Sequence, residues 1–282
     1  MLKIAIPNKG SLSNDSITLL SDAGYHVKRL GRELKLIDSE NQIEFIFLRP
    51  KDIAVYVGNG VLDLGITGRD LVVDSETHAE ELCTLGFGKS AFFYAVPQAS
   101  TLNPNDFGGK RIATSYPNLV ALDLHKRKIK ARVIKLDGAI EISINLGVAD
   151  VIADVVQTGR TLQEAGLKTI GDAVLQSEAV LIGRDLDMAD RSDVKTVIDR
   201  VRGIVVARDY VMIEYDVSKE NLKNACDITP GIEAPTVAPL SRDGWFAVKA
   251  MARKRGINAI IDDLSREGCK GIIVSDIRTC RI

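Results

Sequence analysis

The sequence is poor in cysteine and histidine, and neither residue occurs at a spacing that builds a metal or redox site. The four cysteines include no Cys-x-x-Cys pair, which disfavours a zinc ribbon, a redox pair and a disulfide scaffold. The three histidines lack a His-Glu-x-x-His spacing and lie in polar stretches. We interpret the cysteines as reduced thiols and the histidines as surface residues.

The sequence also lacks an excess of charge of either sign. Its 37 lysines and arginines oppose 38 acidic residues, so the formal net charge is −1. A chain with this balance has no overall basic field to attract nucleic acid or an anionic membrane. We therefore expect neither of those partners, and we expect any bound anion to be held by local groups.

Long apolar runs are missing as well. No uncharged stretch approaches the length of about 18 residues that predicts a membrane-spanning helix, and the first residues show no secretory signal pattern. We expect a cytoplasmic protein. The 45% hydrophobic and 27% charged fractions are typical of globular chains. A length of 282 residues leaves room for two or three compact units.

Short β-branched runs alternate with helical patterns over the first two thirds of the chain. The strand candidates are residues 2–6, 63–67, 111–114, 132–136 and 151–155. Because parallel strands need crossover connections, this alternation predicts an α/β fold. Residues 34–38 and 42–47 instead predict a hairpin. A Pro, Asn and Gly cluster at 101–109 predicts a loop, so we place a boundary near residues 90–105 between two lobes.

The last third has a different order of elements. Strand and helix patterns between residues 210 and 275 follow the sequence strand, helix, strand, strand, helix, strand. That is the order of a ferredoxin-like unit. By analogy of fold, such a unit attached to an α/β body is often a sensor of small molecules.

The sharpest local signal is the segment 154–162, Asp-Val-Val-Gln-Thr-Gly-Arg-Thr-Leu, between a strand and a helical stretch. Backbone amides that open a helix attract an anion, Gly159 permits a close approach, and Thr158 and Thr161 can donate hydrogen bonds. Asp154 could accept from ribose hydroxyls. The spacing alone fits equally well an ordinary turn in which Thr158 caps the helix.

Three further polar loops follow predicted strands. They contain Lys9, Arg49 and the pair Arg69 and Asp70. In open α/β sheets the carboxyl ends of the strands usually bind the ligand. Each loop alone is also compatible with a solvated turn, but together they predict a cleft lined by these four residues. No Walker sequence is present, which disfavours a P-loop kinase.

These segments, taken in order, resemble ATP phosphoribosyltransferase, the committing enzyme of histidine biosynthesis. The resemblance rests on residues 7–10, 48–52, 65–68, 137–141 and 150–162. Residues 227–231 and 234–236 resemble the regulatory domain of the long form of this family. Gln157 departs from the smaller residue expected before Thr158.

The resemblance implies both a fold and a division into domains. The fold is α/β, a two-lobed periplasmic-binding-protein-like catalytic body with a C-terminal ferredoxin-like regulatory domain of βαββαβ order. We assign residues 1–90 with about 184–209 to lobe I. Residues 91–183 then form lobe II, which carries the phosphoribosyl pyrophosphate loop, and residues 210–282 form the regulatory domain.

The reaction implied is transfer of phosphoribosyl from phosphoribosyl pyrophosphate to N1 of ATP, with Mg²⁺ held mainly through the substrate pyrophosphate. Positive charge develops on the ribose ring and negative charge on the leaving group. Lys9 and Arg49 are the candidates to stabilise the leaving group, and Glu141 or Asp154 the candidates to face the ribose. A neutral adenine N1 needs no general base.

The resemblance also implies the remaining contacts. The phosphoribosyl pyrophosphate contacts are Asp154, Gln157, Thr158, Gly159, Arg160 and Thr161. The ATP contacts are Lys9, Gly10, Arg49, Asp70, Leu71 and Ser90. L-histidine, the feedback inhibitor, is expected at Asp216, Thr236 and Gly271, and a homo-oligomer from dimer to hexamer is expected.

Other classes of protein remain open from the residues themselves. Two α/β lobes around a cleft would also suit a solute-binding protein, although the missing signal pattern disfavours an exported one. A cytoplasmic effector-binding regulator would need a DNA-binding face, which is not visible. A phosphoribosyltransferase for a different base is the remaining enzyme rival.

Overall fold

The computed structural model describes residues 1–29, 31 and 33–281; residues 30, 32 and 282, which the predicted domains include, lie outside the described part. The chain divides into two compact units, Met1–Ile198 and Asp199–Ile282. The first contains two sheets and the second contains one. Among the described helices, none is long and apolar enough to cross a membrane.

The first sheet has six strands in the order β2-β3-β1-β4-β11-β5. These are β2 (Lys35–Asp38), β3 (Ile43–Leu48), β1 (Leu2–Pro7), β4 (Leu64–Gly68), β11 (Ala179–Gly183) and β5 (Glu80–Thr84). Strand β1 runs parallel to β3 and β4, and β2 pairs with β3 as the predicted hairpin. With α1 (Ser11–Asp22), α2 (Pro50–Gly58) and α3 (Arg69–Asp74), we call this the six-stranded lobe.

The second sheet has five strands in the order β10-β6-β9-β7-β8. These are β10 (Leu167–Ser177), β6 (Ser90–Pro97), β9 (Val151–Val156), β7 (Arg111–Thr114) and β8 (Arg132–Lys135). With α4 (Pro117–Arg127), α5 (Ile142–Asn145), α6 (Arg160–Glu164) and the short helix η1 (Pro104–Asp106), we call it the five-stranded lobe. Phe92, Tyr94 and Phe107 are fully buried in its core.

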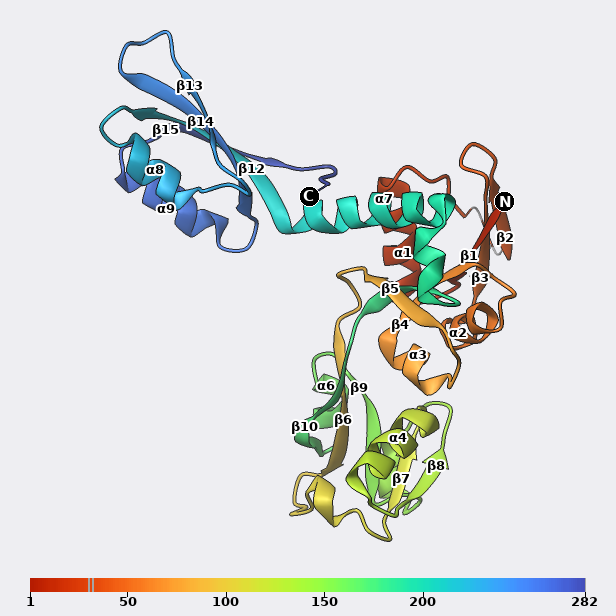
Figure 1. Ribbon diagram of the computed structural model, residues 1–282. Helices are drawn as coiled ribbons and strands as arrows, with labels where there is room; N and C mark the ends of the chain where they lie inside the picture. Colours follow the sequence, from red (N-terminus) through yellow and green to blue (C-terminus); the bar gives the residue numbers. More distant parts are fainter. Residues whose placement is uncertain (30, 32, 282) are drawn as a thin grey trace. The chain divides into compact units, whose positions relative to one another are not determined.

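Two chain segments join the lobes. Strand β5 passes through residues 85–89 to β6, and β10 passes through Glu178 to β11. Figure 1 shows β6 and β10 running side by side as long strands in the five-stranded lobe. The predicted domain bounds remain a prediction; β11, which they assign to lobe II, pairs with β4 and β5 in the six-stranded sheet.

The second unit follows the predicted order β12 (Tyr210–Ser218), α8 (Leu222–Ile228), β13 (Thr236–Pro239), β14 (Trp245–Arg253), α9 (Ile257–Arg266) and β15 (Lys270–Asp276). Its antiparallel sheet has the order β13-β14-β12-β15, which is the ferredoxin-like arrangement. Burial alternates along β12 because one face of the sheet meets the core, and Figure 1 shows α8 and α9 on the same face.

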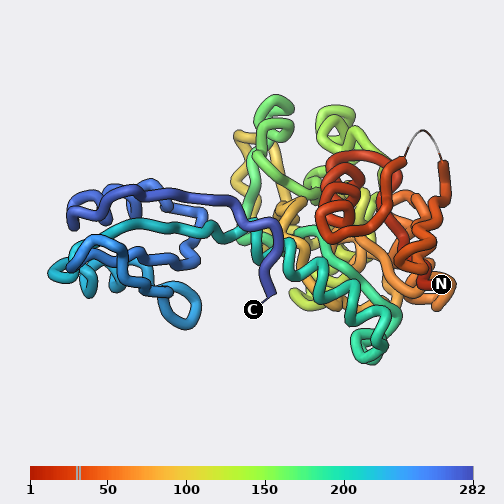
Figure 2. The backbone as a smooth tube through the Cα atoms, turned by 90° about the horizontal axis from the view of Figure 1, so that it is seen from above, coloured from red at the N-terminus to blue at the C-terminus, as the bar shows by residue number. Residues whose placement is uncertain are grey.

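Helix α7 (Ser192–Asp209) leads from the first unit into the second, after the short helix η2 (Leu186–Asp190). The amide of Cys280 donates to the carbonyl of Gly203 at 2.9 Å. Figure 2 shows the corresponding approach of the C-terminal end of the chain to α7.

Candidate active site

The segment 154–162 forms a tight connection between β9 and α6. Gly159 is the N-cap residue of α6 and has φ 75°, a left-handed conformation that glycine adopts without strain. The alternative in which Thr158 caps this helix is therefore wrong. The N-cap makes no side-chain hydrogen bond, so the first amides of α6 have no side-chain acceptor at this position and can meet an anion.

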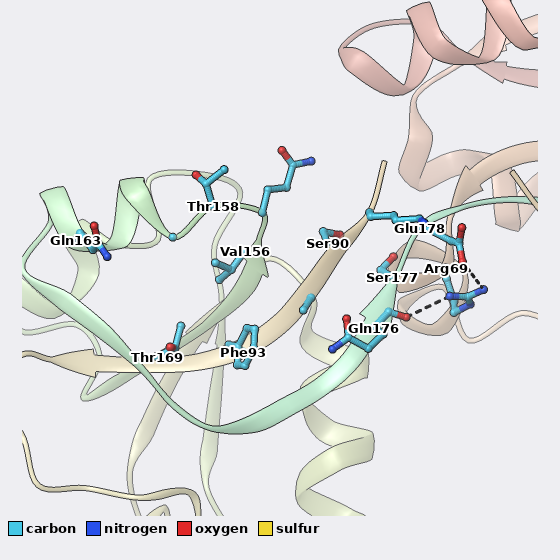
Figure 3. Close-up of a pocket in the computed structure, with 14 residues that line it drawn as sticks. Arg69, Ser90, Phe93, Val156, Thr158, Gln163, Thr169, Gln176, Ser177 and Glu178 are labelled. Carbon is cyan, nitrogen blue, oxygen red and sulfur yellow. Dashed lines mark hydrogen bonds and ion pairs between the residues drawn. The ribbon is translucent and has the colours of Figure 1, made fainter. Parts of the chain in front are cut away.

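Two of the cavities that lie against this loop share four of its residues, Val156 to Gly159. A cavity of about 400 Å³ is also lined by Glu141, Asp154 and Thr161. A cavity of about 600 Å³ is also lined by Arg69, Lys89 and Ser90. In Figure 3, Val156 and Thr158 border the larger cavity on one side, and Gln176 and Ser177 border it on the other.

The smaller cavity contains two carboxylates. Burial raises the pKa of Asp154, and the negative charges of Glu141 and Asp70 raise it further; the amide of Val155 and the charge of Lys51 act in the opposite direction. The Val155 amide donates to Asp154 Oδ1 at 2.8 Å. A cation in this cavity would therefore be stabilised by negative charge that the chain itself does not fully neutralise.

Glu141 is placed by a strained turn. Gly138 has φ 108° and Ala139 has φ 48°, which is a left-handed conformation rarely adopted by alanine. Ile140 is buried in the core, and the hydroxyl of Ser143 donates to its carbonyl. The turn leads directly into the short helix α5, Ile142–Asn145. Contacts inside the five-stranded lobe hold this turn in place. Backbone strain of this kind is common at functional sites.

The side chain of Arg160 is paired within its own helix. Its Nε donates to Glu164 at 2.7 Å as an exposed ion pair within α6. Arg160 is not among the lining residues of either cavity, whereas Gln157, Thr158, Gly159 and Thr161 are. The backbone of the loop and its two threonines are thus better placed for a ligand than the arginine.

Arg69, predicted as a cationic wall of the cleft, is already paired. Its Nε and Nη2 both donate to the Glu81 carboxylate at 2.8 Å, and Glu178 lies 3.6 Å away. Glu81 raises the pKa of Arg69. Nη1 also donates to the carbonyl of Gln176 at 3.3 Å, as Figure 3 shows. Arg69 therefore links β5 to β10 and brings little net charge to a phosphate.

Asp70 and Leu71 are both buried, with 7% and 8% of their surface exposed. The hydroxyl of Ser177 donates to Asp70 Oδ1 at 2.7 Å. Burial, followed by the charge and a hydrogen bond of Asp70, raises the pKa of Tyr116. The Asp70 carboxylate is thus occupied by hydroxyl groups of the five-stranded lobe.

Lys9 and Arg49 lie at the carboxyl ends of adjacent parallel strands. Pro7 is in register with Leu48, and the amide of Asn8 donates to the carbonyl of Leu48 at 2.8 Å. Both cations are exposed, and within the described part of the chain neither has an ion-pair partner. Gly10, the N-cap of α1 with φ 79°, follows Lys9 directly. None of the three lines the two cavities at the phosphate loop.

Two residues near the site were not predicted, Lys51 and Tyr116. Lys51 lies in the first turn of α2, two residues after Arg49, and its charge lowers the pKa of Asp154. Its Nζ lies 5.4 Å from the centre of the Tyr116 ring. Residues 48–52 are among the segments that carry the resemblance, but the proximity of Lys51 to Asp154 depends on contacts between the two lobes.

In the second unit, Asp216 and Gly271 lie close together. A Cβ atom built on Gly271 would be 3.7 Å from Asp216 Oδ2, and Gly271 has φ 59°. Thr236 is exposed on β13, which β14 separates from β12. The structure therefore groups two of the three residues predicted for the effector and places the third two strands away.

Family models match most of the chain. A model described as ATP phosphoribosyltransferase matches residues 49–203, and one described as "HisG, C-terminal domain" matches residues 207–279. The ATP phosphoribosyltransferase of Salinibacter ruber is 54% identical over 283 residues, covering 100% of both chains. That of Corynebacterium diphtheriae is 52% identical over 282 residues, again covering 100% of both.

A solved structure with a similar fold is the ATP phosphoribosyl transferase complex from Thermotoga maritima. It has a TM-score of 0.64 and 27% sequence identity. The match covers 99% of that chain but 73% of this one. The similarity therefore extends over about three quarters of the present chain.

Proposed function

This chain belongs to the ATP phosphoribosyltransferase family, and from that membership we propose that its phosphate loop, Asp154 and Glu141 form the phosphoribosyl pyrophosphate side of the active site. The enzyme transfers phosphoribosyl from phosphoribosyl pyrophosphate to N1 of ATP and releases pyrophosphate. This is the first step of histidine biosynthesis. The proposal concerns which residues carry out the transfer.

The observation that supports it is the open N-terminus of α6. Gly159 gives the turn a left-handed residue without a side chain, and Thr158 and Thr161 line the cavity beside it. Backbone amides and hydroxyls together suit the phosphate of a ribose 5-phosphate. Gln157 lines the same cavity, so it can contribute a hydrogen bond in place of the smaller residue expected there.

The two carboxylates suit the ribose ring. The bond from the ribose to the pyrophosphate breaks as the bond to N1 forms, so positive charge develops on the ring. Asp154, in the negative environment of Glu141 and Asp70, would stabilise that charge and accept hydrogen bonds from the ribose hydroxyls. Since N1 is neutral, binding and orientation contribute more than a general base.

Lys9 and Arg49 are proposed for the leaving group. Both are exposed at the carboxyl ends of β1 and β3, and they have no ion-pair partner among the described residues. Unlike Arg69, they can direct an uncompensated charge toward the departing pyrophosphate. Lys51, which is close enough to lower the pKa of Asp154, is a third cation near the reacting centre.

A metal ion is generally expected for this type of transfer, and we propose Mg²⁺. No group of three or more His, Cys, Asp or Glu residues in the described part of the chain could hold a metal alone. Mg²⁺ is usually held by one or two carboxylates together with substrate phosphates, and Asp154 and Glu141 offer such donors. When bound, the ion would neutralise charge on the pyrophosphate.

We propose the larger cavity for part of the ATP side. Ser90 lines it, and it lies against the same loop residues as the smaller cavity. The predicted contacts Lys9, Gly10 and Arg49 would then bind the polyphosphate from the neighbouring strand ends. Asp70 and Leu71 are buried, so we assign Asp70 to orienting Tyr116 and not to a direct ligand contact.

Regulation and assembly are further parts of the proposal. The Asp216 and Gly271 pair in the ferredoxin-like unit suits the ammonium group of L-histidine, with Thr236 as a more distant candidate. A homo-oligomer from dimer to hexamer is also proposed; the related chain from Thermotoga maritima, solved as a HisG:HisZ complex, supports association with other chains but not its size. The cytoplasm is the proposed location, because ATP and phosphoribosyl pyrophosphate are charged metabolites that do not cross membranes freely.

The test follows pyrophosphate release from ATP, phosphoribosyl pyrophosphate and Mg²⁺, with wild type and Thr161→Val. Loss of one hydroxyl bond to a charged phosphate should raise the KM for phosphoribosyl pyrophosphate about tenfold or more and leave the KM for ATP nearly unchanged. Equal changes in both KM values would overturn the assignment of the loop. The control is Thr196→Val, whose hydroxyl donates to the Ser192 carbonyl at the exposed start of α7.

A further inference from the structure

The N-terminus of α4, in the five-stranded lobe, is capped by a carboxylate of the six-stranded lobe. Asp74 is the last residue of α3, and its Oδ1 accepts from the amides of Asn118 and Leu119 at 3.0 and 3.1 Å. The N-cap residue of α4, Tyr116, provides no side-chain cap of its own. The cap that a helix usually receives from its own chain neighbour thus comes from a residue more than 40 positions away.

A second hydrogen bond strengthens the same contact. The side-chain amide of Asn118 donates from Nδ2 to the backbone carbonyl of Asp74 at 2.8 Å. Asn118 therefore donates both bonds and Asp74 accepts both, and in each bond the main chain of one residue meets the side chain of the other. Such a reciprocal pair fixes both the separation and the orientation of the two helix ends.

Two further side chains of the six-stranded lobe hold the residues just before α4. Lys51 Nζ donates to the carbonyl of Ser115 at 3.0 Å and lies over the ring of Tyr116. Asp70 contacts Tyr116 closely enough to raise the pKa of its hydroxyl, after burial as the main cause. Residues 115–119 are thus bound by Lys51, Asp70 and Asp74, all from the other lobe.

We propose that Asp74 is a positioning residue that holds the two lobes in their closed arrangement and thereby sets the apparent affinity for both substrates. The proposal rests on the two-substrate site proposed above, whose residues come from both lobes. Asp74 lines neither cavity at the phosphate loop, so it acts through α4 and Tyr116. Lobe opening breaks its bonds to α4, and closure restores them.

Water can replace the hydrogen bonds between Asp74 and α4. When the lobes separate, water can hydrate the amides of Asn118 and Leu119 and the Asp74 carboxylate, so the net free energy of the contact is modest. The lobes are connected through residues 85–89, where Gly86 and Gly88 have positive φ values, and through Glu178. This contact between Asp74 and α4, which we call the latch, has a strength suited to an enzyme that must open to admit substrates and release product.

The experiment measures kcat and both KM values for Asp74→Ala, Asp74→Asn and Asp185→Ala. Asp185 is the matched control, because its Oδ1 accepts from the amide of Met188 at 3.0 Å and caps η2 within one lobe. If Asp74→Ala reduces the closed fraction to about one fifth, both KM values rise about fivefold by the same factor. At saturating substrate the lobes close, so kcat changes little.

Asp74→Asn keeps a carbonyl oxygen that can accept both amides, so it should restore most of the affinity. Asn118→Ala provides a second test that leaves the α4 amides capped, and it should raise both KM values by a smaller common factor. Changes confined to one substrate, or unchanged KM values in Asp74→Ala and Asn118→Ala, would overturn the proposal. If Asp74→Ala does not fold, Asn118→Ala alone decides.

The two proposals can fail separately. Thr161→Val tests the loop assignment through one KM, whereas the latch predicts a common factor on both. A common rise in Asp74→Ala with no selective effect of Thr161→Val would retain the latch and remove the loop assignment. The reverse pattern would retain the loop and remove the latch.

Discussion

The Ser177 hydroxyl donates to the buried carboxylate of Asp70 at 2.7 Å across 107 positions of sequence. The same hydroxyl oxygen accepts from the amide of Asp70 at 3.1 Å. Ser177 is the last residue of β10, and Asp70 is the second residue of α3. One serine thus joins the five-stranded lobe to the residue that orients Tyr116.

Ser177→Ala should therefore destabilise the fold. It removes a partner from a carboxylate that is 7% exposed, and an unsatisfied buried group costs about 1–3 kcal/mol. The check is the urea dependence of unfolding. In the control, Ser265→Ala, the lost hydroxyl bond to the Ile261 carbonyl is exposed on α9, so stability should hardly change. Equal losses of unfolding free energy in the two variants would show that the buried bond to Asp70 contributes no more than an exposed one.

Asp154→Asn should be more stable than wild type at pH 7 while losing activity. Burial and neighbouring carboxylates raise the pKa of Asp154 above 3.8. A carboxyl group with a raised pKa binds its proton more tightly in the folded state, so its ionisation lowers stability as pH rises from 3.8 through the folded pKa. Asparagine removes this loss. The rate should fall about hundredfold, as for removal of one preorganised electrostatic group.

Urea unfolding of wild type and Asp154→Asn at a series of pH values checks the sign of this effect. The stability difference should be fully present above the folded pKa and decline as pH falls toward 3.8. Glu164→Gln is the control, because Glu164 forms an exposed pair with Arg160. A variant that is less stable than wild type at pH 7 would contradict the assigned environment of Asp154.

Gly159→Ala should weaken phosphoribosyl pyrophosphate binding through the backbone. The nearest atom to an added Cβ is Val156 Cγ1 at 3.8 Å, so there is space for it, but φ is +75°. A left-handed alanine costs about 1–2 kcal/mol, which relaxation of the loop can relieve by moving the amides away from the phosphate. The KM for phosphoribosyl pyrophosphate should rise about tenfold. Gly108→Ala is the control, since it meets no atom within 4 Å and its φ is not positive; a similar rise there would contradict the backbone explanation.

Much of this organisation was predictable because it depends on local sequence. The hairpin of β2 and β3, the order of the last domain and the loop around Gly159 all follow from alternation, turn residues and a glycine at a strand end. The partners of Arg69 and Asp70 were not predictable, since Glu81 and Ser177 reach them only through the packing of β5 and β10. Strand β10 itself has polar residues and a register shift between Ile170 and Leu175, which hides its alternation.

The proposed effector site is best tested by a single substitution, because α7 continues from the first unit into the second. A truncation after Val206 would cut this helix three residues before its end at Asp209 and would remove the hydrogen bond from the Cys280 amide to the Gly203 carbonyl of the same helix. Loss of inhibition in such a fragment could then follow from unfolding of α7. Asp216→Asn avoids this problem.

Asp216→Asn should raise the histidine concentration needed for half inhibition about tenfold or more, since a charge-assisted hydrogen bond to the ammonium group is lost, with kcat unchanged. Glu214→Gln is the matched control: it lies two residues earlier on β12 and pairs with Lys249 at 2.7 Å, so inhibition should persist. The measurement is pyrophosphate release against histidine concentration. Unchanged inhibition in Asp216→Asn would place the effector elsewhere. Equal loss in both variants would indicate a general weakening of the sheet around β12, where Glu214 is in register with Lys249 and Asp216 with Lys270.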